Sequence, residues 1–152
     1  MRKKLVVKGL LGLLICGAWL FPTYAGDSIY GKVTEVKRAD LVVLDYGQGQ
    51  YNVRIIGVDP PTDADLEKQA REFVAKLVLG KNARLRFEGR RQGEMVGQLQ
   101  TDDKDTGRVD VGLELVRVGL ARRQSNYDYK YGELSAAETE ARRAKRGLWS
   151  SD

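Results

Sequence analysis

The feature that most constrains the fold of this sequence is a close succession of β-strand patterns within residues 29–58. The segment 29–44 contains two runs of β-branched and apolar residues, separated by a polar turn signal at 37–40. A Gly-Gln-Gly hairpin signal at 47–49 leads into a third run at 51–58, which an Asp-Pro-Pro sequence ends abruptly. Three consecutive strands at the start of a fold do not fit a strict alternation of strands and helices.

A helix is predicted directly after the third strand. Its apolar side chains recur with a period of about 3.6 residues. They define one face, formed by Leu66, Ala70, Phe73, Val74 and Leu77. Thr62 followed by Asp65 resembles a capping box at the start of this helix, and Gly80 is expected to end it.

The second half of the chain adds two strands and two helices to the prediction. Residues 83–88 and 95–100 alternate as strands do, whereas 101–108 is polar and is expected to be a solvated loop. Residues 111–118 predict a short apolar helix, and a capping box at Ser135 begins a last helix. The expected fold is one α+β domain, a small mixed barrel of five strands with about three helices.

The first 25 residues have the pattern of a secretory signal peptide, so the folded domain is expected to span 26–152. An apolar stretch at 10–21 follows four basic residues and is shorter than the roughly 20 residues that cross a bilayer. Ala25 offers a small residue for cleavage. The pattern predicts a secreted or periplasmic protein. An uncleaved anchor is one alternative, and lipidation at Cys16 is another, which the bulky residue before that cysteine disfavours.

Removal of this segment changes what the composition implies. It holds four of the 26 basic residues and none of the 21 acidic ones, so the net charge falls from +5 to +1. Overall charge is therefore no argument for nucleic-acid binding. The remaining chain contains neither cysteine nor histidine. This excludes disulfides, Ser-His-Asp triads and zinc sites built on His or Cys, and leaves carboxylates, arginines, lysines and tyrosines for any chemistry.

Three local sequences occur in an informative order: VRIIGVDPP after the third strand, GLA at 119–121 and GLW at 147–149. None is diagnostic alone, but in this order and context the chain resembles the staphylococcal nuclease family over roughly residues 28–149. The resemblance implies a five-stranded OB-type barrel with helices packed around it. It also implies hydrolysis of DNA and RNA phosphodiesters with Ca²⁺. We expect single-stranded DNA or RNA as the preferred partner, a monomer, and no stable membrane span after signal removal.

The resemblance assigns roles to three residues. Arg54 matches an arginine that contacts a phosphate in catalysis, and Asp59 and Asp40 match two aspartates that bind calcium. Such residues suit the chemistry, because guanidinium groups and a divalent cation stabilise the charge that develops on a phosphodiester under attack. Plain structural roles remain open for each: a barrel-edge arginine for Arg54, and turn residues for both aspartates.

Three family positions are altered in this sequence, and in the turn before Asp40 Arg38 also replaces an acid of the family pattern. Pro60 stands where the family has a threonine that lends its carbonyl, and Thr62 stands where a glutamate acts on the attacking water. Glu94 takes the position of a second phosphate-binding arginine, which reverses the charge. Since loss of one transition-state donor costs about 3–4 kcal/mol, these changes predict weak or degenerate catalysis. The neighbouring acids Asp63, Asp65 and Glu67 are possible replacements for the glutamate, or simply acids favoured at a helix start.

Aromatic and basic residues give the binding side of the prediction. The resemblance implies that Tyr127 and Tyr129 contact the nucleotide, and tyrosines interleaved with bases suit single-stranded nucleic acid. Packing on the barrel is an equal alternative for them. Arg90 and Arg91 could turn toward a phosphate, although an ordinary basic hairpin is favoured.

Three classes of function therefore stay open. The first is a calcium-dependent nuclease that uses a shifted carboxylate. The second is a module that binds nucleic acid or another anion after losing the chemistry. The third is a protein-interaction domain of the cell envelope. The favoured hypothesis is a nuclease-like domain whose activity is weak or lost.

Overall fold

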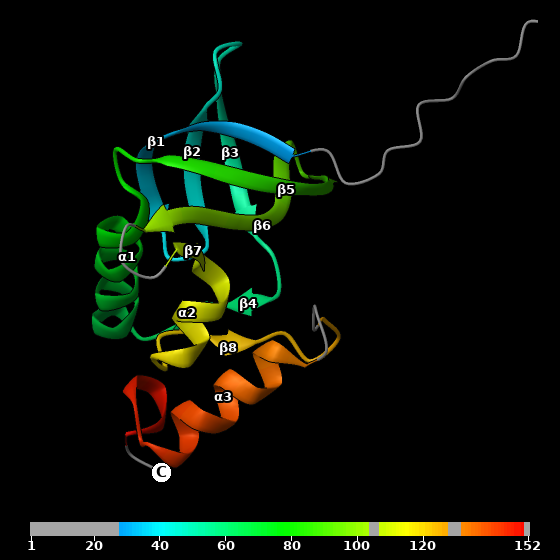
Figure 1. The fold of residues 1–152 in the computed structure, drawn as a ribbon. Coiled ribbons are helices and arrows are strands. Elements are labelled where there is room, and N and C mark those ends of the chain that lie inside the picture. Colours follow the sequence, from blue (N-terminus) through cyan, green and yellow to red (C-terminus); the bar gives the residue numbers. More distant parts are fainter. Residues whose placement is uncertain (1–27, 104–106, 128–131, 151–152) are drawn as a thin grey trace, which may run out of the picture.

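A computed structural model describes residues 28–103, 107–127 and 132–150 (Figure 1). Five strands form a closed barrel in the order β3-β2-β1-β5-β6, in which all neighbours are antiparallel and β3 pairs in parallel with β6 to close it. They are β1 (Ser28–Arg38), β2 (Leu41–Asp45), β3 (Gln50–Ile55), β5 (Asn82–Arg91) and β6 (Glu94–Asp103). The predicted α+β fold, a five-stranded OB-type barrel with three helices, is confirmed.

The barrel interior is filled by side chains that alternate along each strand. Val42, Leu44, Val53, Leu85 and Leu99 are all fully buried. Alternation of this kind directs every second residue outward, because successive side chains of a strand point to opposite faces. Arg54, between two buried neighbours on β3, is therefore placed on the outside of the barrel wall.

The helices pack on the barrel and on one another below its open end (Figure 1). Helix α1 (Ala64–Val78) lies against β1, and α2 (Val111–Arg117) contacts both β6 and α3 (Glu133–Arg143). A short strand β7 (Gly107–Asp110) extends the sheet beyond β6, while β4 (Val58–Asp59) pairs with β8 (Arg122–Arg123). Within the described ranges, no helix is long and apolar enough to cross a membrane.

The two glycine motifs meet in space. A Cβ added to Gly119 would lie 2.3 Å from the carbonyl oxygen of Arg146, and one added to Gly147 would lie 2.3 Å from the carbonyl oxygen of Gly119. The Leu148 amide donates to that same Gly119 carbonyl over 2.9 Å. Both sequences therefore need glycine because the 3₁₀ turn η1 (Gly147–Trp149) docks backbone to backbone on the end of α2.

Two expectations around the third strand were wrong. The strand ends at Ile55 and not at residue 58, because Gly57 turns the chain with a positive φ of 83° and the two residues after it pair with β8 instead. The helix cap is Asp63 and not Thr62: the Asp63 carboxylate accepts from the amides of Asp65 and Leu66. A carboxylate at this position also interacts favourably with the helix dipole.

Two expectations in the second half were also wrong. Residues 101–103 continue β6, and Thr101 is buried where it pairs with both β5 and β7, so the described part of the stretch 101–108 is strand and not solvated loop. The last helix begins at Glu133 and has no side-chain cap at Ser135. Its N-cap is Gly132, whose φ of 82° supplies the change in chain direction.

Candidate functional site

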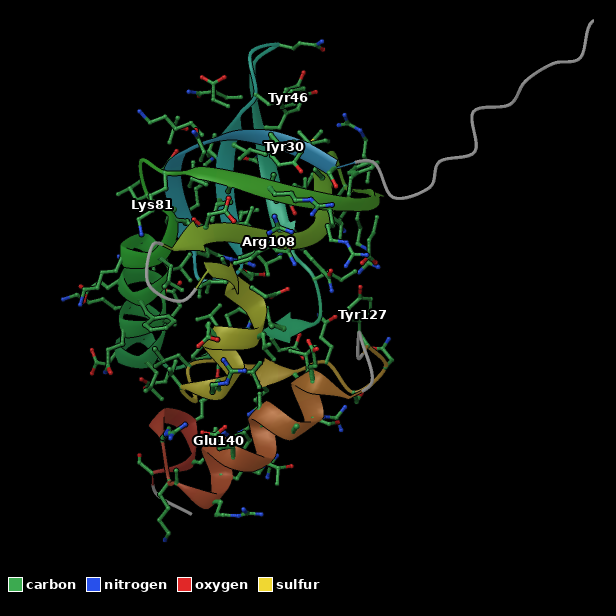
Figure 2. All side chains as sticks on the ribbon, viewed as in Figure 1. Tyr30, Tyr46, Lys81, Arg108, Tyr127 and Glu140 are labelled. Carbon is green, nitrogen blue, oxygen red and sulfur yellow. The ribbon has the colours of Figure 1, made fainter. Side chains whose placement is uncertain are left out.

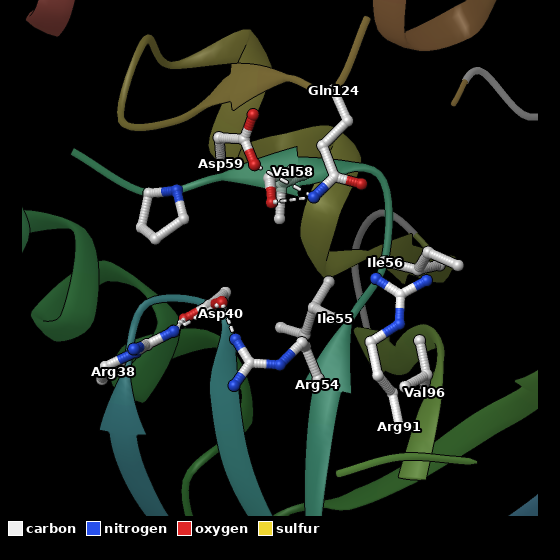
Figure 3. A pocket seen from close by; sticks show the side chains of 11 residues that line it. Arg38, Asp40, Arg54, Ile55, Ile56, Val58, Asp59, Arg91, Val96 and Gln124 are labelled. Carbon is white, nitrogen blue, oxygen red and sulfur yellow. Dashed lines mark hydrogen bonds and ion pairs between the residues drawn. The ribbon is translucent and has the colours of Figure 1, made fainter. Parts of the chain in front are cut away.

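A cavity of about 320 Å³ lies between the end of the barrel and strand β4 (Figure 3). Arg38, Asp40 and Arg54 line it from the barrel side, and Asp59, Pro60 and Gln124 line it from the opposite side. Arg91 extends along it from the β5–β6 hairpin. The cavity thus brings together all three residues to which the sequence assigned catalysis or calcium.

The backbone fixes Asp40 beside Arg54. Arg54 pairs with Leu41 across β2 and β3, so the turn residue Asp40 lies next to it. The Asp40 carbonyl accepts from the Ile55 amide over 2.8 Å, which anchors the turn to the end of β3. Glu67 on α1 accepts from the Ala39 amide over 3.4 Å and ties the same turn to the helix. The geometry of this pair is therefore determined by the barrel and not by a free loop.

Four side chains, Arg38, Asp40, Arg54 and Glu94, form an ion-pair chain of alternating charge. Arg38 contacts both carboxylate oxygens of Asp40, at 2.8 and 2.9 Å, and Arg54 Nη1 contacts Asp40 Oδ2 at 2.6 Å. Arg54 Nε in turn donates to Glu94 Oε2 over 2.7 Å. Asp40 is 4% exposed, so its charge depends on these partners.

The electrostatics of Arg54 follow from its two acidic neighbours. Burial lowers the pKa of Arg54, but the hydrogen bond that Arg54 donates to Glu94 and the charges of Asp40 and Glu94 together raise it above its usual range. The guanidinium is thus charged, and its charge is already neutralised within the protein. The ion-pair chain contains two cations and two anions, and it offers a phosphate little net attraction.

Calcium does not fit the residues at this cavity. Calcium requires 6–8 oxygen ligands, supplied by converging carboxylates. Both carboxylate oxygens of Asp40 are occupied by guanidinium groups, and Asp59 Oδ1 on the opposite wall accepts from Gln124 Nε2 over 3.0 Å. No group of three acidic, histidine or cysteine side chains suited to a metal occurs among the described residues. Arg38 instead contributes the positive charge that Asp40 requires.

The altered family positions separate in the structure. Pro60 lines the cavity, whereas Thr62 is exposed and does not line it. Of the possible replacement acids, Asp63 is engaged as the helix cap and Glu67 holds the turn at Ala39. Asp65 remains as an exposed acid in the first turn of α1. The structure therefore brings none of these acids into the cavity wall.

Of the tyrosines predicted to contact substrate, Tyr127 does not line the cavity. The ring of Tyr127 packs over Gly57, where a Cβ would approach it to 2.7 Å, and its hydroxyl donates to Glu88 over 2.6 Å (Figure 2). Burial, followed by the hydrogen bond with Glu88, raises the pKa of Tyr127. Tyr129 lies outside the described residues. A role in substrate binding stays a prediction for both.

Sequence reasoning missed the ion pairs of Arg38 with Asp40 and of Glu94 with Arg54. Each stands at a family position where the resemblance implies the opposite charge, an acid for Arg38 and an arginine for Glu94. The available signal was that two charge reversals occur together. Two reversals that together preserve local neutrality indicate that the introduced charges, Arg38 and Glu94, pair with the retained charges, Asp40 and Arg54.

Comparisons with known proteins agree with this fold. Residues 52–151 match the family model described as staphylococcal nuclease homologue. An uncharacterized endonuclease of Escherichia coli O157:H7 is 28% identical over 90% of this chain and 87% of its own length. A thermonuclease of Staphylococcus hyicus is 27% identical over 84% of this chain and 79% of its own length. A staphylococcal-like nuclease of Arabidopsis thaliana is 32% identical over 67% of this chain and 30% of its own length. This chain belongs to the staphylococcal nuclease family.

Proposed function

We propose that this domain binds nucleic acid at the cavity and cleaves it weakly or not at all. One observation carries the proposal: Arg54 and Asp40, two central residues of the expected site, are paired within the ion-pair chain with Glu94 and Arg38. The relatives named as nucleases support nucleic acid as the ligand.

The chemistry explains why hydrolysis is expected to be weak. Attack on a phosphodiester requires donors aimed at the oxygens that gain charge, and a group that orients the attacking water. Arg54 has donors committed to two carboxylates, and Thr62 cannot act as a carboxylate base. Each missing contribution costs about 3–4 kcal/mol, or a factor of about 10²–10³ in rate.

Binding relies on different groups from hydrolysis. Arg38 is half exposed at its side chain although it contacts Asp40, and Arg91 adds exposed donors to the cavity lining. These groups suit a phosphate, because guanidinium donors match its oxygens. With a net charge of only +1 for residues 26–152 and few cations at the cavity, we expect weak affinity that falls with salt.

An active calcium-dependent nuclease is the second candidate. It is favoured by the placement of Arg54, Asp40 and Asp59 around one cavity, and by the names of the relatives. In that case calcium would displace Arg38 from Asp40, and Asp65 is the acid left to act on water. The misfit of calcium with the paired carboxylates makes this the weaker candidate.

A cleavage assay separates the two candidates. Purified protein is incubated with single-stranded DNA and with RNA, in calcium and in chelator, beside an Asp59→Ala variant of equal helicity and thermal midpoint. The proposal expects cleavage no greater than that of the variant, together with salt-dependent binding of an oligonucleotide. Calcium-dependent cleavage that the variant loses would establish the active enzyme. Absence of both cleavage and binding would favour a protein-interaction domain.

The location of the protein is part of the proposal. The basic and apolar pattern of residues 1–25 supports export to the periplasm or the medium. Cell fractionation followed by N-terminal sequencing tests this: a mature chain that begins near Gly26 outside the cytoplasm is expected. A cytoplasmic chain that retains residues 1–25 would contradict it.

A further inference from the structure

Two arginines lie over the buried ring of Trp149 in the C-terminal half of the fold. The guanidinium carbons of Arg142 and Arg122 are 3.7 and 4.8 Å from the centroid of that ring. Trp149 is 2% exposed, whereas both arginines are exposed. Arg122 belongs to β8, Arg142 to α3 and Trp149 to η1, so the contact joins three elements of the helical half of the molecule (Figure 1). We refer to Arg122 and Arg142 as the Trp149 arginine pair.

The hydrogen-bond donors of this pair remain available. A guanidinium carries five N–H donors in its own plane, so contact with an aromatic ring does not saturate them. Within the part of the chain that the structure describes, neither guanidinium donates a hydrogen bond, and their one ion pair joins Arg142 Nη2 to Glu138 Oε2 at 3.8 Å. The ring therefore fixes the position of two cations whose donors can still contact a ligand.

The charges around the Trp149 arginine pair do not balance. Glu138 Oε2 is 3.8 Å from Arg142 Nη2 and 3.5 Å from Arg123 Nε, so one carboxylate serves two arginines. The described residues up to Asp110 carry thirteen basic and thirteen acidic side chains, whereas those after it carry seven basic and four acidic ones. The positive charge of the domain is therefore concentrated around α3 and β8.

Strand register places Arg122 beside the cavity. Asp59 on β4 is the direct cross-strand partner of Arg122 on β8, so the two side chains start from the same face of this two-stranded sheet. Gln124 reaches the same face, because its Nε2 donates to Asp59 Oδ1 over 3.0 Å. Asp59 and Gln124 both line the cavity. A chain of phosphates that leaves the cavity past Asp59 therefore meets the Trp149 arginine pair.

We propose that the Trp149 arginine pair is a second phosphate-binding site, which holds the backbone of a nucleic-acid strand outside the cavity. Each guanidinium donates to phosphate oxygens of a strand that extends from the cavity over β8 toward α3. An anionic membrane is the less suitable partner: among the described residues the exposed large apolar side chains are Tyr30 and Leu79, and neither belongs to β8, α3 or η1. This inference rests on the proposed binding function and adds to it a second site, and hence a dependence of affinity on strand length.

The test measures binding of labelled oligothymidylates of about 4 and about 16 nucleotides, the limits of the usual site size of such barrels, by fluorescence anisotropy. Arg122→Gln/Arg142→Gln is expected to weaken binding of the longer strand about tenfold and binding of the shorter strand less than twofold. The slope of log affinity against log salt should fall by about 1.4 for the longer strand, because each lost phosphate contact lowers it by about 0.7. Arg122→Gln alone, at an exposed position, should lower the slope by about 0.7.

Two further variants separate this role from overall charge and from packing. Arg71→Gln/Arg84→Gln removes the same charge away from the cavity, and Arg84 also lies over a ring, that of Tyr30, at 5.8 Å. We expect it to change the affinity for either strand less than twofold. Arg122→Lys/Arg142→Lys retains both charges without the planar groups that contact Trp149. Retention of the salt slope in this variant, with its loss in the glutamine variant, would assign the effect to charge and not to packing.

The outcomes separate this inference from the function on which it rests. If the unmodified protein binds neither oligonucleotide, the proposed function and the second site both fail. If it binds, and the glutamine variants keep the affinity and the salt slope for the longer strand, the cavity binds nucleic acid and the second site is refuted. The second site is also refuted if the double glutamine variant loses binding to phosphatidylglycerol vesicles but not to the longer strand, because the pair would then recognise lipid phosphates.

Discussion

The guanidinium of Arg54 donates to the carboxylate of Glu94 over 2.7 Å, so the residue that the resemblance aligns with one arginine of the family pairs with the residue that it aligns with the other. The same relation holds on the other side, where Arg38 replaces an acid of the family and neutralises Asp40. The two reversals preserve the local charge balance, and they engage the carboxylate oxygens of Asp40 and donors of Arg54 in ion pairs within the protein.

Reversal of these changes is predicted to restore chemistry. The variant Arg38→Asp/Thr62→Glu/Glu94→Arg frees Arg54 and Asp40 and supplies a base, and each restored contribution is worth about a factor of 10² or more. We expect calcium-dependent cleavage of single-stranded DNA at least about 100-fold above the unmodified protein, measured by release of labelled fragments.

Calcium itself provides the control for this restored site. A millimolar calcium addition should raise the thermal midpoint of the restored variant and leave that of the unmodified protein unchanged, because only a ligand that binds the folded state stabilises it. Stabilisation of the unmodified protein by calcium, with loss of the effect in Asp59→Ala, would mean that the ion-pair chain opens for the metal.

Asp40 is predicted to matter for stability more than Asp59 does. Asp40→Asn leaves Arg38 and Arg54 without their shared, buried partner, and loss of one member of a buried pair costs about 3–5 kcal/mol. Because Glu94 still pairs with Arg54, we expect Asp40→Asn to lower the free energy of unfolding by about 3 kcal/mol, measured by urea denaturation. The exposed Asp59→Asn should change stability by less than about 1 kcal/mol. Equal effects would show that the pairing of Asp40 carries no net stability.

The contact between the two glycine motifs is testable with a matched pair of substitutions. Gly119 and Gly80 have nearly the same φ, 75° and 74°, but a Cβ at Gly80 meets nothing within 4 Å. Gly80→Ala should cost about 1–2 kcal/mol from the left-handed conformation alone. Gly119→Ala adds a clash with the Arg146 carbonyl. We therefore expect this variant to lose about 3 kcal/mol or more of unfolding free energy, measured by denaturant unfolding. Similar values for both would mean that η1 shifts without cost.

Alkaline pH is predicted to destabilise the protein through Tyr127. Burial and the hydrogen bond with Glu88 raise the pKa of Tyr127 above its ordinary value of 10.0, so the folded state retains a proton that the unfolded state loses. The stability from this group is fully present below about pH 10 and is lost as pH rises toward the folded-state pKa. The urea midpoint should therefore fall more steeply above pH 10 for the unmodified protein than for Tyr127→Phe. Parallel curves would refute the shift.

Local sequence determined most of the barrel. The β-branched runs and the hairpin signals placed β1, β2 and β3, and the helical period placed α1, because these patterns express which side chains must be buried. The same patterns located Arg54 and Asp40 at adjoining ends of their strands. The predictions were wrong at element boundaries. At the start of α1, for example, Asp63 and not its neighbour Thr62 acts as the N-cap, and local sequence does not distinguish such neighbouring polar residues.

Only the tertiary structure decided what the site residues do. Arg54 and Glu94 are 40 positions apart and become partners because β3 closes the barrel against β6. The same closure brings Arg90 of β5 over the ring of Tyr51 on β3. Sequence alone defines which charges are present, whereas the net field at a cavity depends on which charges are close enough to cancel. That distance is a property of the closed barrel.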